Sequence, residues 1–280
     1  MNLVEVLRRA TGYLAGHGST SPRLDAELLL AHCLELRRLD LYLQHDRDLD
    51  EPELIPYREL TRRRGQGEPV AYLTGRREFM GLDFEVTPAV LVPNPDTELL
   101  VQLVVAWGRA MPREVRLAEV GVGSGCVAIS IAHNLPTASI VGSDIDPQAL
   151  LVAARNVSRH GLESRIDLLE GDLLANAPLE LDAVVANLPY LPDGLDLASE
   201  VLAQPAGALR GGPTGGELVE RLLRESIGHL YPGGRTFVEA DPMVMGRLVE
   251  VAESCYQGVR VHRDLGGHQR VLEAWTAPSA

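Results

Sequence analysis

The amino-acid sequence predicts an α/β fold in which a seven-stranded sheet with a reversed last strand follows a small helical bundle and a β-hairpin. Three observations support this prediction. From Asp96 onward, short apolar segments alternate with longer amphipathic ones, which is typical of a parallel sheet covered by helices on both faces. The last two apolar segments are joined by a turn too short for a helical crossover, so they must run antiparallel. Before residue 70, apolar residues recur at helical spacing instead.

The helical region begins close to the N-terminus. Residues 3–14 carry apolar side chains at helical spacing, and Ser21 followed by Pro22 forms an N-cap and first-turn pair that opens a second helix through Leu36. Residues 51–64 also have a helical pattern. The first seventy or so residues are therefore expected to form a small helical bundle.

A hairpin separates this bundle from the sheet. Residues 77–86 alternate apolar and polar side chains around Gly81, as two short antiparallel strands would. We therefore expect three parts in the chain. They are a helical domain at residues 1–75, a hairpin linker at 76–95 and a catalytic domain at 96–280.

Seven segments of the third part have the length and composition of strands. They are residues 116–120, 139–143, 165–169, 182–186, 235–239, 259–263 and 270–274. The turn Asp264-Leu265-Gly266-Gly267 between the last two makes the final pair antiparallel.

Composition excludes several classes of function. The net charge of -13 and the pI near 5.1 remove the long-range attraction to phosphate, so direct binding of nucleic acid is not expected. The three cysteines lack CxxC spacing and the histidines lack metal-ligand spacing, so neither a disulfide framework nor a metal site is predicted. The N-terminus has no apolar segment of signal-peptide or membrane-spanning length, which predicts a cytoplasmic protein with no membrane partner.

The first candidate ligand site is the glycine-rich turn after the first predicted strand. That strand runs into Gly121-Val122-Gly123-Ser124-Gly125, and an apolar helix follows. Glycine lets the backbone approach a ligand closely and adopt positive φ, so this is a binding turn, although a turn without ligand would look similar in isolation. Its G-x-G-x-G spacing differs from the dinucleotide fingerprint, and Glu119 offers a carboxylate to a cationic aminoacyl sulfonium.

Acidic residues follow the next two predicted strands. Asp144 can accept both ribose hydroxyls of a nucleoside, whereas Asp146 is expected to cap the helix that begins at Pro147. Asp172 and Leu173 offer an acceptor and an apolar wall for an adenine, although Asp172 could equally be an ordinary turn residue. Three successive strand ends with these features predict one nucleoside-binding edge.

The most informative segment is Asn187-Leu188-Pro189-Tyr190, which ends the fourth predicted strand. The nitrogen of an amide or aromatic amine is a poor nucleophile because its lone pair is delocalised. An Asn side-chain oxygen and the carbonyl of Leu188 could each accept one N–H of such a group and hold it in line for attack. Pro189 would stiffen the loop and Tyr190 would offer a flat face to a planar acceptor. We therefore assign all four residues to acceptor binding and catalysis, with Asn187 also bordering the cofactor.

These motifs resemble those of class I S-adenosylmethionine-dependent methyltransferases, whose Rossmann-like fold has a seven-stranded sheet with a reversed last strand. The Asn-x-Pro-Tyr tetrapeptide resembles both amide methyltransferases and adenine methyltransferases acting on DNA or RNA. The flanking segments Glu68-Pro-Val-Ala-Tyr-Leu-Thr-Gly75, Arg77-Glu-Phe79, Pro93-Asn-Pro-Asp-Thr-Glu98 and Asp264-Leu-Gly-Gly-His-Gln-Arg270 are similar to the protein-(glutamine-N5) methyltransferase family. That resemblance implies S-adenosylmethionine as cofactor, class I peptide chain release factors as partners, their Gly-Gly-Gln glutamine as acceptor, and a helical domain that docks the substrate.

The chain departs from the family pattern at several positions. Leu188 replaces a usual proline, Asn94 replaces a usual arginine, and the segment around Gln204-Pro205 is less acidic than in the family. These departures concern the substrate more than the chemistry. A ribosomal-protein glutamine methyltransferase is therefore the alternative, followed by an adenine-specific DNA or RNA methyltransferase, which the acidic charge disfavours. The intact tetrapeptide argues against a cofactor-binding protein without catalysis.

Overall fold

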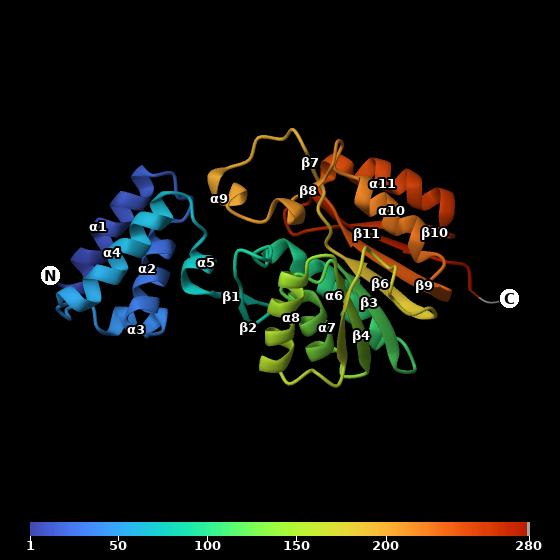
Figure 1. Cartoon of the computed structure of the whole chain (residues 1–280), viewed down its shortest axis with the longest axis horizontal. Helices are drawn as coiled ribbons and strands as arrows, with labels where there is room; N and C mark the ends of the chain where they lie inside the picture. Colours follow the sequence, from blue (N-terminus) through green and yellow to red (C-terminus); the bar gives the residue numbers. More distant parts are fainter. Residues whose placement is uncertain (279–280) are drawn as a thin grey trace. The chain divides into compact units, whose positions relative to one another are not determined.

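The computed structural model describes residues 1–278 and divides the chain into two compact units (Figure 1). The first contains Met1–Arg76 together with Leu197–Ala203, and the second contains Arg77–Asp196 and the chain from Gln204 onward. No helix of the described chain is both long enough and apolar enough to cross a membrane.

The first unit is the predicted helical bundle. Its helices are α1 (Leu3–Gly16), α2 (Pro22–Cys33), α3 (Arg38–Leu43), α4 (Glu51–Gly65) and α5 (Val70–Thr74). Leu14, Leu29 and Leu30 are fully buried and pack at its centre. Helix α2 ends at Cys33 rather than at Leu36, because Glu35 adopts a positive φ of 52° that a helix cannot continue through.

A short segment from much later in the chain completes this unit. It carries α9 (Ser199–Leu202), whose Glu200 binds the guanidinium of Arg64 at 2.7 Å. Arg64 also binds Asp25 of α2 at 2.7 Å, and its side chain is 4% exposed. A buried charge is costly unless it is paired, so these two carboxylates explain why Arg64 can lie inside the bundle.

The hairpin consists of β1 (Arg76–Phe79) and β2 (Leu82–Glu85). Phe79 and Phe84 are almost fully buried in the core of the second unit. Asn156 binds both backbone groups of Glu85, at 2.8 and 2.9 Å. The hairpin therefore packs onto α8 (Pro147–Arg159) as part of the second unit.

The sheet of the second unit has seven strands in the order β10-β11-β9-β6-β3-β4-β5 (Figure 1). Their bounds are β3 Val115–Val120, β4 Ala138–Asp144, β5 Ile166–Glu170, β6 Leu181–Ala186, β9 Leu230–Glu239, β10 Gly258–Arg263 and β11 Gln269–Trp275. The last strand, β11, runs antiparallel to both of its neighbours, while the other neighbouring pairs are parallel. The predicted fold class is confirmed.

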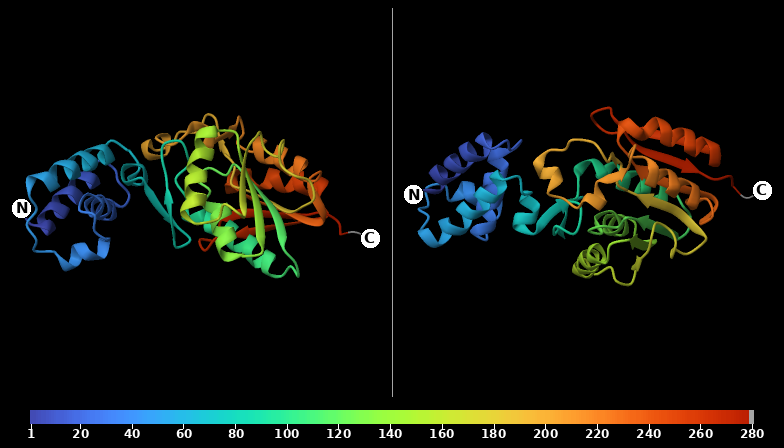
Figure 2. Two further views of the ribbon diagram at one scale, coloured as in Figure 1. Left: turned by 60° about the horizontal axis from the view of Figure 1, so that its bottom comes forward. Right: turned by 45° about the horizontal axis from the view of Figure 1, so that its top comes forward.

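Helices cover both faces of this sheet (Figure 2). One face packs against α6 (Glu98–Arg109), α7 (Cys126–Asn134) and α8, and the other packs against α10 (Glu217–Ser226) and α11 (Pro242–Cys255). The apolar residues of β6 alternate between the two cores, whereas its buried Asp182 is paired with Arg113. The parallel strands end at one edge, and the candidate site residues follow those ends.

Candidate active site

The glycine-rich turn after β3 adopts a conformation that requires glycine. Gly121, Gly123 and Gly125 have φ values of 73°, 53° and 80°. A side chain is strained in this region of φ, whereas glycine is not. The amides of Gly121 and Val122 both donate to the carbonyl of Ser143 in β4, at 2.8 and 2.9 Å. The conformation of the turn is therefore fixed by its glycines and by these two backbone hydrogen bonds, and the turn leads directly into α7.

Asp144 at the end of β4 is tied to this turn. One carboxylate oxygen accepts the Gly123 amide at 2.9 Å and the other accepts the Asp146 amide at 3.0 Å. Burial raises the pKa of Asp144, and these two amides oppose that rise. Asp146 accepts the Gln148 amide at 2.8 Å and caps α8, as the sequence predicts. The structure thus brings Asp144 and residues 121–125 together.

Glu119, one of the predicted cofactor residues, lies below the turn and is 3% exposed. Its carboxylate accepts the Ala128 amide in the first turn of α7 at 2.7 Å. Burial raises the pKa of Glu119 well above its ordinary value, and the nearby Asp144 charge adds to the rise. Glu119 therefore anchors the start of α7 through its hydrogen bond to the Ala128 amide.

Asp172 and Leu173 are placed differently from the other predicted cofactor residues. The carboxylate of Asp172 is ion-paired with Arg221 of α10 and lines a cavity of about 560 Å³ with residues such as Leu174 and His229. No residue of the glycine-rich turn lines that cavity. Leu173 is buried, and its carbonyl accepts the Ser143 hydroxyl at 2.9 Å. The Asp172 side chain is therefore already bonded to α10.

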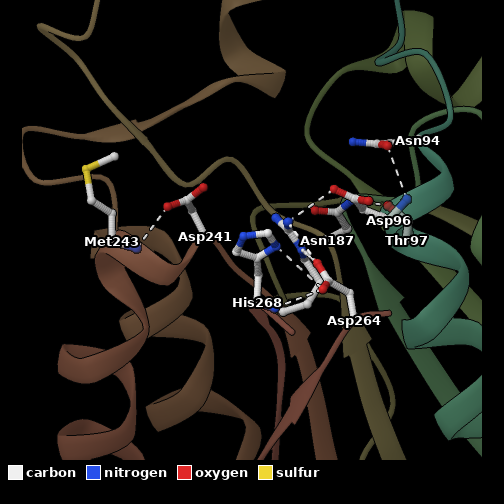
Figure 3. A network of polar contacts seen from close by, with 9 residues as sticks. Asn94, Asp96, Thr97, Asn187, Asp241, Met243, Asp264 and His268 are labelled. Carbon is white, nitrogen blue, oxygen red and sulfur yellow. Dashed lines mark hydrogen bonds and ion pairs between the residues drawn. The ribbon is translucent and has the colours of Figure 1, made fainter. Parts of the chain in front are cut away.

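The tetrapeptide follows β6 directly and meets the glycine-rich turn. Asn187 donates from its side-chain nitrogen to the Thr97 hydroxyl at 2.9 Å (Figure 3). Leu188 is 5% exposed, and a Cβ placed on Gly121 would lie 2.9 Å from its Cδ2 atom. Tyr190 packs against the core under α10 and α11, where burial raises its pKa. Acceptor candidates and cofactor candidates thus touch through Leu188 and Gly121.

Two further glycines shape the backbone of the tetrapeptide. A Cβ on Gly211 would collide with the carbonyl oxygen of Pro189, and one on Gly215 would collide with that of Tyr190. These close approaches accompany the parallel pairing of β7 (Leu191–Pro192) with β8 (Arg210–Gly212). No role was predicted for these glycines, although two Gly-Gly pairs within a few residues are a signal of close backbone contact.

A charged network missed by the sequence reading surrounds Asn187 (Figure 3). Arg270 of β11 binds Asp96 and Asp264, each at 3.2 Å. Asp96 belongs to the 3₁₀ helix η1 (Pro95–Thr97), which Asn94 caps by accepting the Asp96 amide at 3.1 Å. An arginine at position 94 would have no side-chain acceptor for this bond. Two of the segments that carry the family resemblance, residues 93–98 and 264–270, therefore meet beside the tetrapeptide.

Glu239, at the end of β9, was also missed. Its side chain is fully buried, and burial raises its pKa to about 7. Nothing in its strand pattern distinguishes it, because the sequence shows only an acidic residue after a run of apolar ones. Among the residues that the structure describes, no group of three or more His, Cys, Asp or Glu is arranged to hold a metal ion.

Two family models match this chain. They are the PrmC N-terminal domain over residues 5–75 and the methyltransferase small domain over residues 94–245. Curated relatives named release factor glutamine methyltransferase include that of Rhodopirellula baltica, 38% identical over 96% of this chain and 95% of the relative. The relative from Moorella thermoacetica is 40% identical over 98% of this chain and 99% of its own length.

Solved structures with a similar fold include methyltransferases. One is a methyltransferase from Pyrococcus furiosus, with a TM-score of 0.54 and 19% identity, covering 70% of this chain and 90% of that chain. This likeness shows the fold alone. The family follows from the sequence relatives, which match over nearly the full length, and from both domain models. The chain belongs to the release factor glutamine methyltransferase family.

Proposed function

We propose that this enzyme transfers a methyl group from S-adenosylmethionine to the side-chain amide nitrogen of the glutamine in the Gly-Gly-Gln motif of class I peptide chain release factors. The relatives named for this activity support it. The observation that carries it is the orientation of Asn187. Its nitrogen is bound by Thr97, so its carbonyl oxygen is turned away from that bond and is free to accept an N–H.

The turn after β3 fits such a cofactor. Glycines at positive φ let the backbone of the turn approach a ligand closely, and the half-buried Asp144, which binds the Gly123 amide, keeps carboxylate lone pairs available for ribose hydroxyls. The 16S rRNA methyltransferase of Thermus thermophilus was solved with AdoMet and guanosine, and it has a similar fold (TM-score 0.52, 18% identity, 72% of this chain and 49% of that chain). When bound, S-adenosylmethionine supplies an electrophilic methyl group.

The cofactor residues that we propose follow from this fit. They are Glu119, Gly121, Val122, Gly123, Ser124, Gly125, Asp144, Asp172, Leu173 and Asn187. Their parts differ: Asp144 binds the ligand directly, whereas Glu119 holds the start of α7 in place. Asp172 takes part only by giving up its ion pair with Arg221 or through its backbone. Substitutions at Asp172 should therefore affect cofactor affinity less than substitutions at Asp144.

The acceptor amide would be held by two oxygens. The Asn187 side-chain oxygen and the Leu188 carbonyl each accept one N–H, which fixes the nitrogen and favours its pyramidal geometry as the new N–C bond forms. Pro189 limits movement of the loop, and the half-buried Tyr190 borders the planar amide. Hydrogen bonds that strengthen as charge develops on the nitrogen accelerate the reaction rather than only binding the substrate.

We also propose that the helical unit docks the protein substrate. The PrmC N-terminal domain model matches it over residues 5–75, and it carries exposed apolar side chains such as Leu39, Leu43 and Ile55. Binding energy from a remote surface can position a reacting group that contributes little affinity itself. Removal of this unit should therefore impair methylation of a folded release factor more than methylation of a short Gly-Gly-Gln peptide.

A single assay tests the function. The full-length enzyme is incubated with methyl-labelled S-adenosylmethionine and, in separate reactions, a purified bacterial release factor, ribosomal proteins and an adenine-containing RNA. We expect label in the release factor only, on the Gly-Gly-Gln glutamine by mass spectrometry, and none in a release factor with Gly-Gly-Asn instead. Label in ribosomal protein or RNA, but not in the release factor, would refute the assignment.

A further inference from the structure

Glu239 is a buried acid whose carboxylate has no standard hydrogen bond. Its side chain is fully buried at the end of β9, and neither carboxylate oxygen makes a hydrogen bond of standard length and angle within the described chain. Buried carboxylates are costly, and almost all buried polar groups in native proteins are hydrogen-bonded. Such a group at a sheet edge beside a candidate active site therefore calls for a functional explanation.

The sheet register places Glu239 beside Asn187. Ala186 of β6 pairs with Val238 of β9 in a parallel ladder, so Asn187 and Glu239 are the next residues on two neighbouring strands. Thr97 is 2% exposed and accepts the Asn187 side-chain N–H at 2.9 Å. The Thr97 hydroxyl also lies close enough to Glu239 to lower the pKa of that carboxyl. Thr97 is therefore bonded to Asn187 and acts on the charge of Glu239.

The hydrogens in this group can be assigned by elimination. A threonine hydroxyl has one hydrogen to donate and two lone pairs to accept with. Because Asn187 donates to Thr97, the threonine hydrogen must point elsewhere, and Glu239 is the acidic acceptor near it. An ionised carboxylate can only accept a hydrogen bond. A hydrogen bond from Thr97 to Glu239 would make the hydrogen bonds run in one direction, from Asn187 through Thr97 to Glu239.

We propose that Glu239 is a positioning residue for methyl transfer, an inference that rests on the proposed function. Its carboxylate accepts the Thr97 hydrogen, Thr97 accepts the Asn187 N–H, and the Asn187 carbonyl oxygen is thereby fixed toward the acceptor amide. The opposite amide orientation would present an N–H to the substrate N–H and would be inactive. The buried charge of Glu239 thus selects one of two otherwise similar orientations of the Asn187 side-chain amide.

This arrangement predicts a dependence on pH. Burial raises the pKa of Glu239 to about 7, Asp96 adds to the rise, and Thr97, Arg270 and Tyr190 oppose it. Those four groups come from η1, β11 and the loop after β6, and the buried thiol of Cys126 at the start of α7 also lies within the range of the Glu239 charge. Below that pKa the protonated carboxyl can donate to Thr97 and no longer requires its hydrogen. Turnover should therefore rise as pH increases through about 7, and Glu239→Gln should abolish this step.

The test is a double-mutant cycle with Glu239→Gln and Thr97→Val in the full-length enzyme, measured with methyl-labelled S-adenosylmethionine and release factor. We expect each single variant to lower kcat by about 10-fold, the size of one lost hydrogen bond, with an unchanged Kd for S-adenosylmethionine. The double variant should lose no more than Thr97→Val alone, because Glu239 acts through Thr97. Thr97→Ser, which keeps the hydroxyl, should stay within about 3-fold of wild type.

Two controls separate positioning from folding. Thr236→Val removes a different buried hydroxyl, one on the same strand as Glu239 that bonds the Tyr256 hydroxyl at 2.8 Å, and should lower Tm without lowering kcat. Glu239→Gln removes a buried charge whose pKa is raised in the folded state, so its Tm at pH 8 should equal or exceed that of wild type. Losses that add in the double variant, or a Glu239→Gln enzyme with wild-type kcat and pH profile, would overturn the positioning role. Failure of the wild-type enzyme to methylate release factor would instead overturn the proposed function.

Discussion

The two sides of the site lie at one edge of one sheet but are built in different ways. The proposed cofactor side depends mainly on backbone, through three glycines with positive φ and amides bound to the end of β4. The acceptor side depends on side chains from η1, β6, β9 and β11, which lie far apart in sequence. On the cofactor side many backbone groups each contribute a small part of the binding energy. On the acceptor side each contact depends on one side chain. Substitutions should therefore act more sharply on the acceptor side.

The largest effect is expected at Asn187. Asn187→Ala removes the side-chain oxygen that would hold the acceptor amide, and turnover should fall by about 100- to 1,000-fold, as for the loss of one oriented catalytic dipole. The Kd for S-adenosylmethionine, measured by calorimetry, should change little because the contact serves the transition state. Asn134→Ala, at a helix end where Asn134 binds the Ser130 carbonyl at 2.9 Å, is a matched control with wild-type turnover. If Asn187→Ala kept turnover near that of the parent enzyme, the proposed role of Asn187 in holding the acceptor amide would be refuted.

A smaller effect is expected on the cofactor side. Asp144→Ala should weaken S-adenosylmethionine binding by about 10- to 150-fold, corresponding to about 1.5 to 3 kcal/mol for hydrogen bonds to a charged group. The amide of Gly123 would lose its acceptor at the same time. Asp146→Ala is the control, because it removes the α8 cap and should cost about 1 kcal/mol of stability with little change in Kd. An unchanged Kd for Asp144→Ala would remove this residue from ribose binding.

The same contrast explains which parts of the molecule could be predicted from sequence. Every residue of β6 is buried, as its apolar sequence predicts, and the glycines after β3 adopt the positive φ values that glycine favours. Local sequence was therefore sufficient to predict both the strand and the turn. The early start of β9 at Leu230 was missed because Pro232, Gly233 and Gly234 interrupt its pattern. Segment Leu197–Ala203 belongs to the helical unit, where Glu200 binds Arg64. This pairing could not be predicted from local sequence, because the two residues lie far apart in the chain.

The acceptor side could be predicted only in part. Asn187 was recognisable because an Asn-x-Pro-Tyr sequence at a strand end is unusual, but its partner Thr97 lies 90 residues earlier in the chain. Glu239 is an ordinary acidic residue until the sheet register sets it beside Asn187. Asp172 was predicted to follow the third strand and does follow β5, but its ion pair with Arg221 could not be predicted from local sequence. Side-chain partners that come from separate elements require the folded structure.

The smallest effect is expected at Leu188, where the two sides meet. The proposed acceptor contact uses the backbone carbonyl of residue 188, which every amino acid has, so Leu188→Pro should keep substantial turnover. Leu188→Gly should lose more, because it removes a side chain that is 5% exposed and packs over Gly121, and because glycine adds about 0.5 to 1 kcal/mol of backbone freedom. Leu188→Ala separates these causes, since it loses most of the packing but keeps the backbone restriction. Turnover and Tm measured together should give the order Leu or Pro, then Ala, then Gly. A stably folded but inactive proline variant would show that the amide or side chain of residue 188 takes part directly, and that the acceptor side reaches further into the glycine-rich turn than its carbonyl alone.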